Sequence, residues 1–420
     1  MTNETQLALC CARTELSSRD CSTLEALLRR DLDWQQVLEF ASWHRIFTFL
    51  YRNLRSCGIR GTDHDEALRK LGDAYYASAA LHLRRQGELQ KTLTALRAED
   101  IPVIVLKGAA LAETVYPDPA LRVMEDVDLL VEEHHLERAD VLIRGFGYDT
   151  AKTPYDEDVA RDRHRHYPTL VSESGLTCFE VHRHLVTRDN RFHFDISQCW
   201  DSARRVKIAG VETWMLGPED MLFHLCVGFF LDRRRFHQSR AALRQLVDVA
   251  ETIRHFGSEL DWDRFVRVTR QRRARGPLHC ALMAARELLD SPVPGAVLEE
   301  LRPAGFDAAM NRAFIDRKVL EIAPWFLHEL VTVADNTRLN MAKSAVRRIF
   351  LPGEYLRVKY WPNVERPMRL YFHHGLEVSR FIGGSARRPG RTAEHLRVDR
   401  WMHFLEAPPG EELEALHDRR

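Results

Sequence analysis

The pair Asp126 and Asp128 is the feature of this sequence with the clearest chemical meaning. The two acids are two positions apart in an apolar run, and side chains two apart on a β-strand point to the same face. Two carboxylates held that close repel each other and raise each other's proton affinity unless a cation lies between them. Carboxylate oxygens suit a hard ion such as Mg²⁺, which also bridges the phosphates of a substrate. The pair therefore predicts a metal site for phosphoryl or nucleotidyl transfer.

A two-metal site generally needs a third carboxylate from a neighbouring strand, and Glu180 is the best candidate. His182 alternates with Glu180 along the same predicted strand, where it can act as a base or contact the substrate. Direct metal ligation by His182 stays open. The same alternation in His164, His166 and His184 suggests a zinc or acid–base site, but such pairs are also common on half-exposed strands.

Lys107 and Gly108 are the predicted phosphate-binding residues. A glycine between a strand and a helix lets backbone N–H groups approach an anion, and the helix N-terminus adds favourable partial charge. Lys107 adds a full positive charge, and Arg122 can clamp triphosphate oxygens through its planar guanidinium group. The structural alternatives are a solvated Lys107 and an Arg122 paired with Glu125 or Asp126.

An α+β core is needed to bring these residues together. The β-branched run that begins at Ile101 favours a buried strand, and Pro117 ends the helix that follows Gly108. The predicted strands cover residues 101–106, 127–131, 167–171, 176–181 and 211–216, with helices at 109–116 and 134–144 and an extended segment opening at 145–148. The expected fold is an α+β mixed sheet between two helical regions.

Helical spacing of apolar residues flanks this core on both sides. The second helical region begins at Gly217 and Pro218, which is a typical helix start. Asp248 is expected to cap one of its amphipathic helices or to lie on the surface of that helix. The predicted units are an N-terminal helical region (1–99), the core (100–216), a helical domain (217–335) and a basic, aromatic-rich C-terminal region (336–420).

The composition limits the partners and the compartment. Lys plus Arg (61) equals Asp plus Glu (61), so the protein has no net positive charge that would attract nucleic acid or an acidic membrane over its whole surface. A local basic excess in the C-terminal region leaves either partner open, although charge runs usually form a solvated surface. The eight cysteines include no C-x-x-C pair, and there is neither a secretory signal nor an apolar run of ~18 residues. The sequence predicts a cytoplasmic protein with reduced thiols and no membrane span.

The polymerase-β-type nucleotidyltransferase superfamily has a similar pattern: a glycine turn after a first strand, an acidic pair on the next strand, and a later third acid. More specifically, the sequence resembles the bacterial "uncharacterised nucleotidyltransferase" family, whose members often accompany peptide or polysaccharide biosynthetic genes. The resemblance covers about Ile101 to Leu225 and continues weakly to Asp248. It is carried by segments 106–111, 126–131, 179–182 and 218–220, together with Tyr116 and Arg122. The chain departs from the superfamily at the turn, which lacks a serine, and at Glu180, which replaces an aspartate.

The resemblance and the residues together imply a metal-dependent nucleotidyltransferase that uses Mg²⁺ or Mn²⁺ and a nucleoside triphosphate, which we expect to be ATP. The predicted site comprises Asp126, Asp128 and Glu180 as catalytic metal ligands, and Lys107, Gly108, Arg122 and His182 as nucleotide-binding residues. The acceptor is expected to be a small molecule, a peptide or a protein rather than RNA.

Two other functions remain open. One is a kinase-like phosphotransferase that uses the same metals, and the other is a non-catalytic nucleotide sensor or partner-binding protein. No P-loop, dinucleotide-binding glycine motif, zinc-protease motif or nucleophile elbow competes with the acidic pair.

Overall fold

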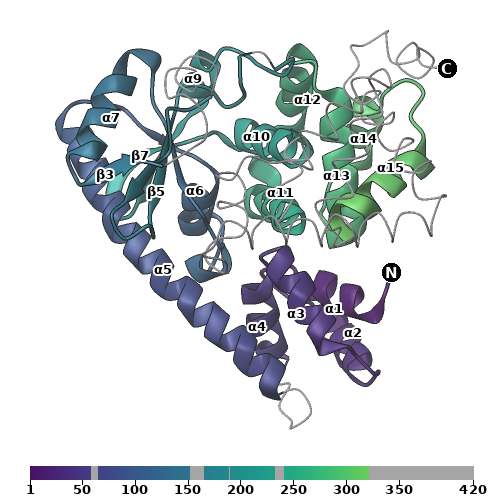
Figure 1. The fold of residues 1–420 in the computed structure, drawn as a ribbon. Coiled ribbons are helices and arrows are strands. Elements are labelled where there is room, and N and C mark those ends of the chain that lie inside the picture. Colours follow the sequence, from purple (N-terminus) through teal and green to yellow (C-terminus); the bar gives the residue numbers. More distant parts are fainter. Residues whose placement is uncertain (58–64, 152–164, 189, 232–240, 321–420) are drawn as a thin grey trace, which may run out of the picture. The chain divides into compact units, whose positions relative to one another are not determined.

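The computed structural model describes residues 1–57, 65–151, 165–188, 190–231 and 241–320 (Figure 1). The predicted C-terminal region 336–420 and the end of the predicted helical domain lie outside these residues. The chain divides into two compact units, and the larger contains the described residues up to Phe306. In the second unit the structure describes α15 (Ala308–Ile315) and a π-helical turn, η5 (Asp316–Leu320).

The larger unit contains a seven-stranded mixed sheet with strand order β3-β4-β5-β2-β1-β7-β6. The pairs β2–β5 and β1–β7 are parallel, and the other neighbours are antiparallel. The strands are β1 (Ile104–Val105), β2 (Val127–Leu130), β3 (Tyr148–Thr150), β4 (Leu170–Ser172), β5 (Cys178–His182), β6 (Arg204–Ile208) and β7 (Val211–Met215). This arrangement confirms the α+β class and places β2, which follows Asp126, between β1 and β5.

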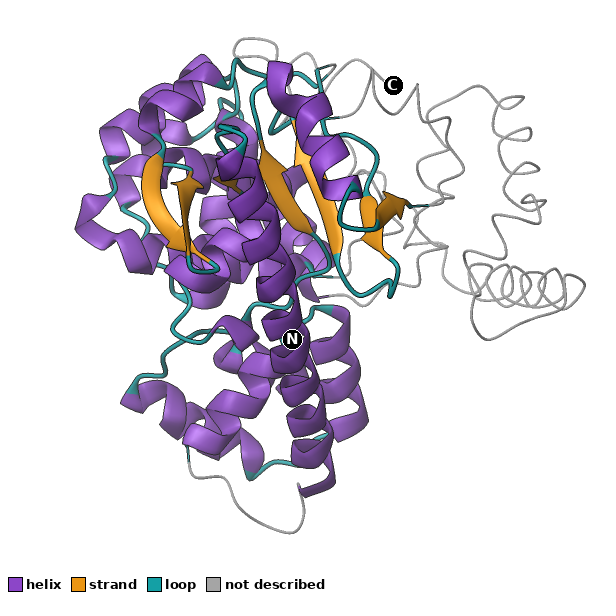
Figure 2. Ribbon diagram, turned by 90° about the vertical axis from the view of Figure 1, so that its left-hand side faces the viewer, coloured by secondary structure: helices purple, strands orange, loops and turns teal. Residues whose placement is uncertain are grey.

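Helices precede and follow the sheet in the sequence, as the hydrophobic spacing predicts. The long helix α5 contacts β7 and α7, and α6 packs against β2 (Figures 1 and 2). The helices of the larger unit are α1 (Asn3–Cys11), α2 (Ser18–Leu28), α3 (Trp34–Trp43), α4 (Phe47–Ser56), α5 (Asp65–Ala98), α6 (Lys107–Thr114), α7 (Leu136–Arg144), α9 (Ser197–Ser202), α10 (Pro218–Leu231), α11 (Ala242–Phe256), α12 (Trp262–Gln271), α13 (Arg275–Leu289) and α14 (Gly295–Leu301). Short 3-10 turns are η2 (Pro119–Leu121), η3 (Glu133–His135) and η4 (Gly257–Glu259).

Strand β6 and helix α9 were not predicted. Strand β6 forms an antiparallel hairpin with β7, closed by a two-residue turn at Ala209 and Gly210. Both turn residues have positive φ, 49° and 77°, as a type I′ hairpin turn requires. Sequences that form this turn usually have Asn-Gly or Asp-Gly, because alanine rarely adopts a positive φ. The hairpin was therefore not predicted from Ala209 and Gly210.

All eight cysteines lie among the described residues, and each is a free thiol. In the part of the chain that the structure describes, no helix combines the length and apolar character needed to cross a membrane.

Gly217 directly precedes helix α10, and we expect its replacement by alanine to destabilise the protein. A Cβ atom at this position would lie 2.7 Å from the backbone oxygen of Ser202, and backbone cannot rotate away as a side chain can. Overpacking of this kind costs about 1–3 kcal/mol in the free energy of unfolding. Gly228, inside the same helix, has no atom within 4 Å of its virtual Cβ. Gly228→Ala should therefore stabilise the protein by about 0.5–1 kcal/mol, and urea denaturation of both variants tests the contrast.

Candidate functional site

The acidic residues meet because β2 and β5 run parallel in register. Asp128 pairs with Glu180 across the two strands, and Leu130 pairs with His182. Residues paired in register project to the same face of a sheet, and so do residues two apart on one strand. Asp128, Glu180 and His182 therefore share one face of the sheet, the acidic face, while Val127 and Leu129 are buried.

Three side chains of this face form a compact group with the geometry of a metal site. One potential ligand atom each from Asp128, Glu180 and His182 lies within 4.8 Å of the others. The Nε2 atom of His182 lies 2.8 Å from Asp128 Oδ1 and 3.4 Å from Glu180 Oε2. His182 is 1% exposed, so this proton-bearing ring is shielded from water and held between two carboxylates.

Glu180 is also contacted from the residues that lead into β4. Thr169 donates a hydrogen bond of 3.1 Å to Glu180 Oε1, and His166 Nε2 lies 3.4 Å from Glu180 Oε2. Burial alone would raise the pKa of Glu180, but the hydrogen bond from His182 and the nearby His166 lower it to about 2. The carboxylate is therefore ionised, as a metal ligand must be.

The two aspartates have opposite electrostatic environments. Burial, then the charges of Asp128 and Glu180, raise the pKa of Asp126 to about 6. Burial acts in the same direction on Asp128, but its contact with His182 holds its pKa well below the usual range. Burial is thus the main cause of the raised pKa of Asp126, and the neighbouring carboxylates of Asp128 and Glu180 add to it. It lies outside the compact group of three and directly precedes β2.

Lys107 and Gly108 begin helix α6, so the predicted strand–glycine–helix connection is present. Lys107 has a positive φ of 36°, and no side chain caps the helix N-terminus at Leu106. The positive charge of Lys107 lowers the pKa of both Asp126 and Asp128, which places this lysine beside the acidic residues. The helix N-terminus and the acidic face therefore meet at one end of β1 and β2.

Gly108 is tightly packed, and we expect Gly108→Ala to cost about 1 kcal/mol in the free energy of unfolding, at the low end for overpacking. Its virtual Cβ would lie 3.0 Å from Met124 Cγ and 3.1 Å from Met124 Sδ. Methionine is flexible and can shift by the few tenths of an ångström required. Thermal unfolding of the variant measures this cost. A loss several times larger would show that Met124 cannot move.

Arg122 is buried in an ion pair that the sequence did not predict. Its Nε lies 2.7 Å from Asp248 Oδ1, and the Tyr116 hydroxyl donates to the same oxygen at 2.7 Å. Arg122 is 5% exposed and Asp248 1%, so the expectation of a capping or surface Asp248 was wrong. The partner of Arg122 is on α11 rather than at Glu125 or Asp126, because the chain brings this helix against the core.

Arg85 of α5 binds the backbone segments that lead into β2 and β5. Its guanidinium donates to the backbone oxygens of Met124 and Glu125, at 2.5 and 3.2 Å, and to that of Leu176, at 3.1 Å. Met124 and Glu125 precede Asp126, and Leu176 precedes β5. A single buried side chain therefore joins the backbone before β2 to that before β5.

Three more groups that the sequence patterns did not single out surround the acidic face. The charge of Arg244 lowers the pKa of Asp126, and that of Arg165 lowers the pKa of Asp128. Burial, then Lys107 and Arg165, hold the pKa of the buried His224 well below its usual range, so its imidazole is neutral. No local motif marks these residues, because they reach the site from segments distant in the sequence.

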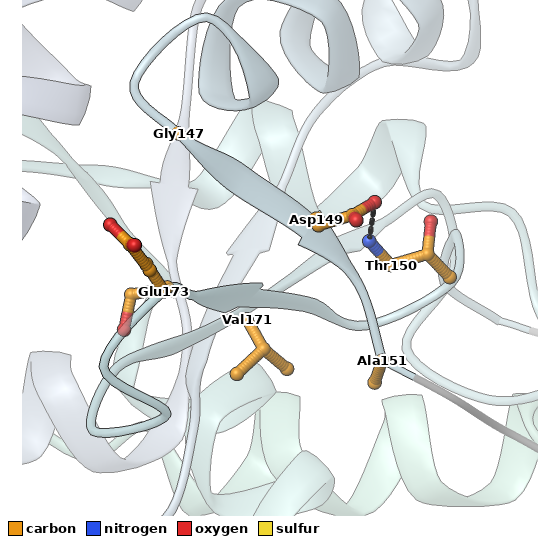
Figure 3. Close-up of a pocket in the computed structure, with 7 residues that line it drawn as sticks. Gly147, Asp149, Thr150, Ala151, Val171 and Glu173 are labelled. Carbon is orange, nitrogen blue, oxygen red and sulfur yellow. Dashed lines mark hydrogen bonds between the residues drawn. The ribbon is translucent and has the colours of Figure 1, made fainter.

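A separate hollow of about 540 Å³ lies at the edge of the sheet beside β3 and β4 (Figure 3). Two acidic residues, Asp149 and Glu173, line it, and Asp149 already accepts a hydrogen bond of 2.7 Å from the backbone N–H of Thr150. The hollow contains none of the predicted site residues. We therefore place the candidate site at the acidic face of β2 and β5.

Comparison with known proteins adds one finding. A family model described as "Uncharacterised nucleotidyltransferase" matches residues 30–290, which include every residue of the acidic face and of the Arg122–Asp248 ion pair. Searches of the curated proteins and of the solved structures found no match.

Proposed function

Because this chain belongs to the uncharacterised nucleotidyltransferase family, we propose that it transfers a nucleoside monophosphate from a nucleoside triphosphate to an acceptor hydroxyl. Pyrophosphate is the second product. The observation that carries the proposal is the group of Asp128, Glu180 and His182 on adjacent parallel strands, with Asp126 and Lys107 beside it.

The residues present fit a divalent cation. Carboxylate oxygens are preferred ligands of Mg²⁺ and Mn²⁺, and Asp128 and Glu180 supply them from one face, with Asp126 directly before β2. Burial first, and then the charges of Asp128 and Glu180, raise the pKa of Asp126, and a cation would favour its ionised form. A metal held by these residues would supply positive charge that stabilises the charge developing on the phosphates. His182 supplies either a nitrogen ligand or a hydrogen bond that orients Asp128.

The protein's own residues position the reactants. Lys107 and the N-terminal N–H groups of α6 bind the triphosphate, which has the negative charge that a helix N-terminus favours. We propose that Arg122, whose Nε is held by Asp248 and whose Nη1 donates to Val123, contributes its positive charge near the phosphates. Positioning and charge neutralisation supply most of the rate enhancement in reactions of this kind. The acceptor hydroxyl attacks the α-phosphorus, and the bond to the pyrophosphate oxygen breaks.

The order of elements supports a polymerase-β-type core. Strand β1 is followed by α6, which begins at Lys107 and Gly108; β2, antiparallel to β1, carries Asp128, and β5, parallel to β2, carries Glu180. We propose ATP as the nucleotide and a small molecule, peptide or protein as the acceptor.

The test is incubation of the protein with Mg²⁺ or Mn²⁺ and each labelled nucleoside triphosphate, in a lysate of the source cells. We expect pyrophosphate release and transfer of the α-phosphate label to one product. Release of a nucleoside diphosphate would instead identify a phosphotransferase. If no nucleotide is bound or consumed under any condition, the catalytic proposal is wrong and a sensor or scaffold is favoured.

A further inference from the structure

Arg244 is a charged side chain that the proposed mechanism does not yet use. It lies in the first turn of α11, and its Nη1 donates a 2.6 Å hydrogen bond to the backbone oxygen of Val123. Val123 is three residues before Asp126. Helix α11 therefore places this guanidinium where the chain enters the acidic strand.

The positive charge of Arg244 is not neutralised by an ion pair. Among the described residues it forms no salt bridge with a carboxylate, and its buried Nε has no hydrogen-bond partner. Asp248, one turn further along α11, accepts instead from Arg122 and Tyr116. Arg244 is half-buried, and a cation in such a position without a direct ion pair to a described carboxylate would be stabilised by a bound anion.

Several charges show where that anion belongs. Burial, then the charge of Arg122, lowers the pKa of Arg244 to about 10, while the charges of Asp248 and Glu125 raise it. Arg244 is hydrogen-bonded to the backbone of Val123, three residues before Asp126, and Lys107 follows Leu106, whose backbone N–H donates to the backbone oxygen of Asp128 at 3.0 Å. The acidic face thus has a positive group from α6 and another from α11, which suits a metal–polyphosphate complex of mixed charge.

We propose that Arg244 binds the triphosphate chain of the nucleotide, with Lys107 as its partner from α6. The inference rests on the proposed function, because it assigns a residue to the substrate of that reaction. A guanidinium group matches phosphate oxygens in a bidentate manner and does not contact the base. The triphosphate chain alone should therefore be bound, and inorganic tripolyphosphate should compete with the nucleotide.

The experiment is calorimetric titration of Mg²⁺–ATP and of inorganic tripolyphosphate into the wild-type chain, Arg244→Gln and Arg244→Lys. Loss of a charge-assisted hydrogen bond predicts about tenfold to hundredfold weaker binding of both ligands to Arg244→Gln. Arg244→Lys keeps the charge and should retain part of the affinity. Arg267→Gln removes the same charge from an exposed position on α12 and should bind both ligands as the wild type does.

The outcomes separate this inference from the proposed function. If wild type and Arg244→Gln bind both ligands equally, the Arg244 assignment is overturned while nucleotidyl transfer stands. If the wild-type chain neither binds nor consumes any nucleotide, the proposed function fails, and this inference fails with it. Should Arg244→Gln not fold, Arg244→Lys decides: affinity equal to wild type for both ligands overturns the bidentate contact.

Discussion

Asp128→Asn is expected to lower the rate of nucleotidyl transfer about a thousandfold or more, because the metal contributes several kcal/mol and each 1.36 kcal/mol is a factor of ten. Asparagine has the shape of aspartate but lacks its charge. The substitution therefore removes a ligand from the group that Asp128 forms with Glu180 and His182, and leaves the strand packing unchanged. Initial rates of pyrophosphate release at fixed Mg²⁺ concentration measure the effect.

Glu173→Gln is the matched control, because it removes one carboxylate from an exposed position beside the same sheet. Its rate should equal that of the wild type, and the thermal unfolding of both variants shows whether the fold is retained. A folded Asp128→Asn protein with the wild-type rate would contradict the metal-site assignment. Loss of transfer with the biological role preserved would instead favour the nucleotide-sensing alternative.

Candidate site residues could be predicted from the sequence where a short local pattern determines which way their side chains point. The alternation of two acids in an apolar run predicts that Asp126 and Asp128 share one face, because the period of a strand is two; in the structure Asp128 lies on β2 and Asp126 directly precedes it. Glu180 could be proposed from composition and order alone, but its register with Asp128 is a property of the β2–β5 pairing. The contact between His182 and Asp128 follows from that register.

The rest of the site depends on contacts between distant segments. Arg85, Arg165 and Arg244 reach the acidic strands from segments that carry no recognisable motif. Asp248 looked like a surface residue because the spacing along α11 shows only which residues share a face, and not what packs against that face. Strand β6 was missed for a local reason, the unusual alanine in its turn.

Asp248→Ala is expected to reduce the free energy of unfolding by about 3–5 kcal/mol, the range for removal of one partner from a buried ion pair. The substitution leaves Arg122 charged and 5% exposed, and it also removes the oxygen to which Tyr116 donates. Urea denaturation followed by circular dichroism measures the loss. Asp263→Ala, at an exposed position on α12, should change stability by less than about 0.5 kcal/mol.

A double variant shows whether the cost arises from the unpaired charge. Arg122→Met with Asp248→Leu replaces both partners by apolar side chains of similar size, so most of the stability lost in Asp248→Ala should return. If the double variant is as unstable as the single one, the loss is a packing defect at α11. If Asp248→Ala itself unfolds within about 1 kcal/mol of the wild type, the ion pair contributes little beyond an average hydrogen bond. Recovered stability without nucleotide binding would show that Arg122, and not only the fold it supports, is needed at the phosphates.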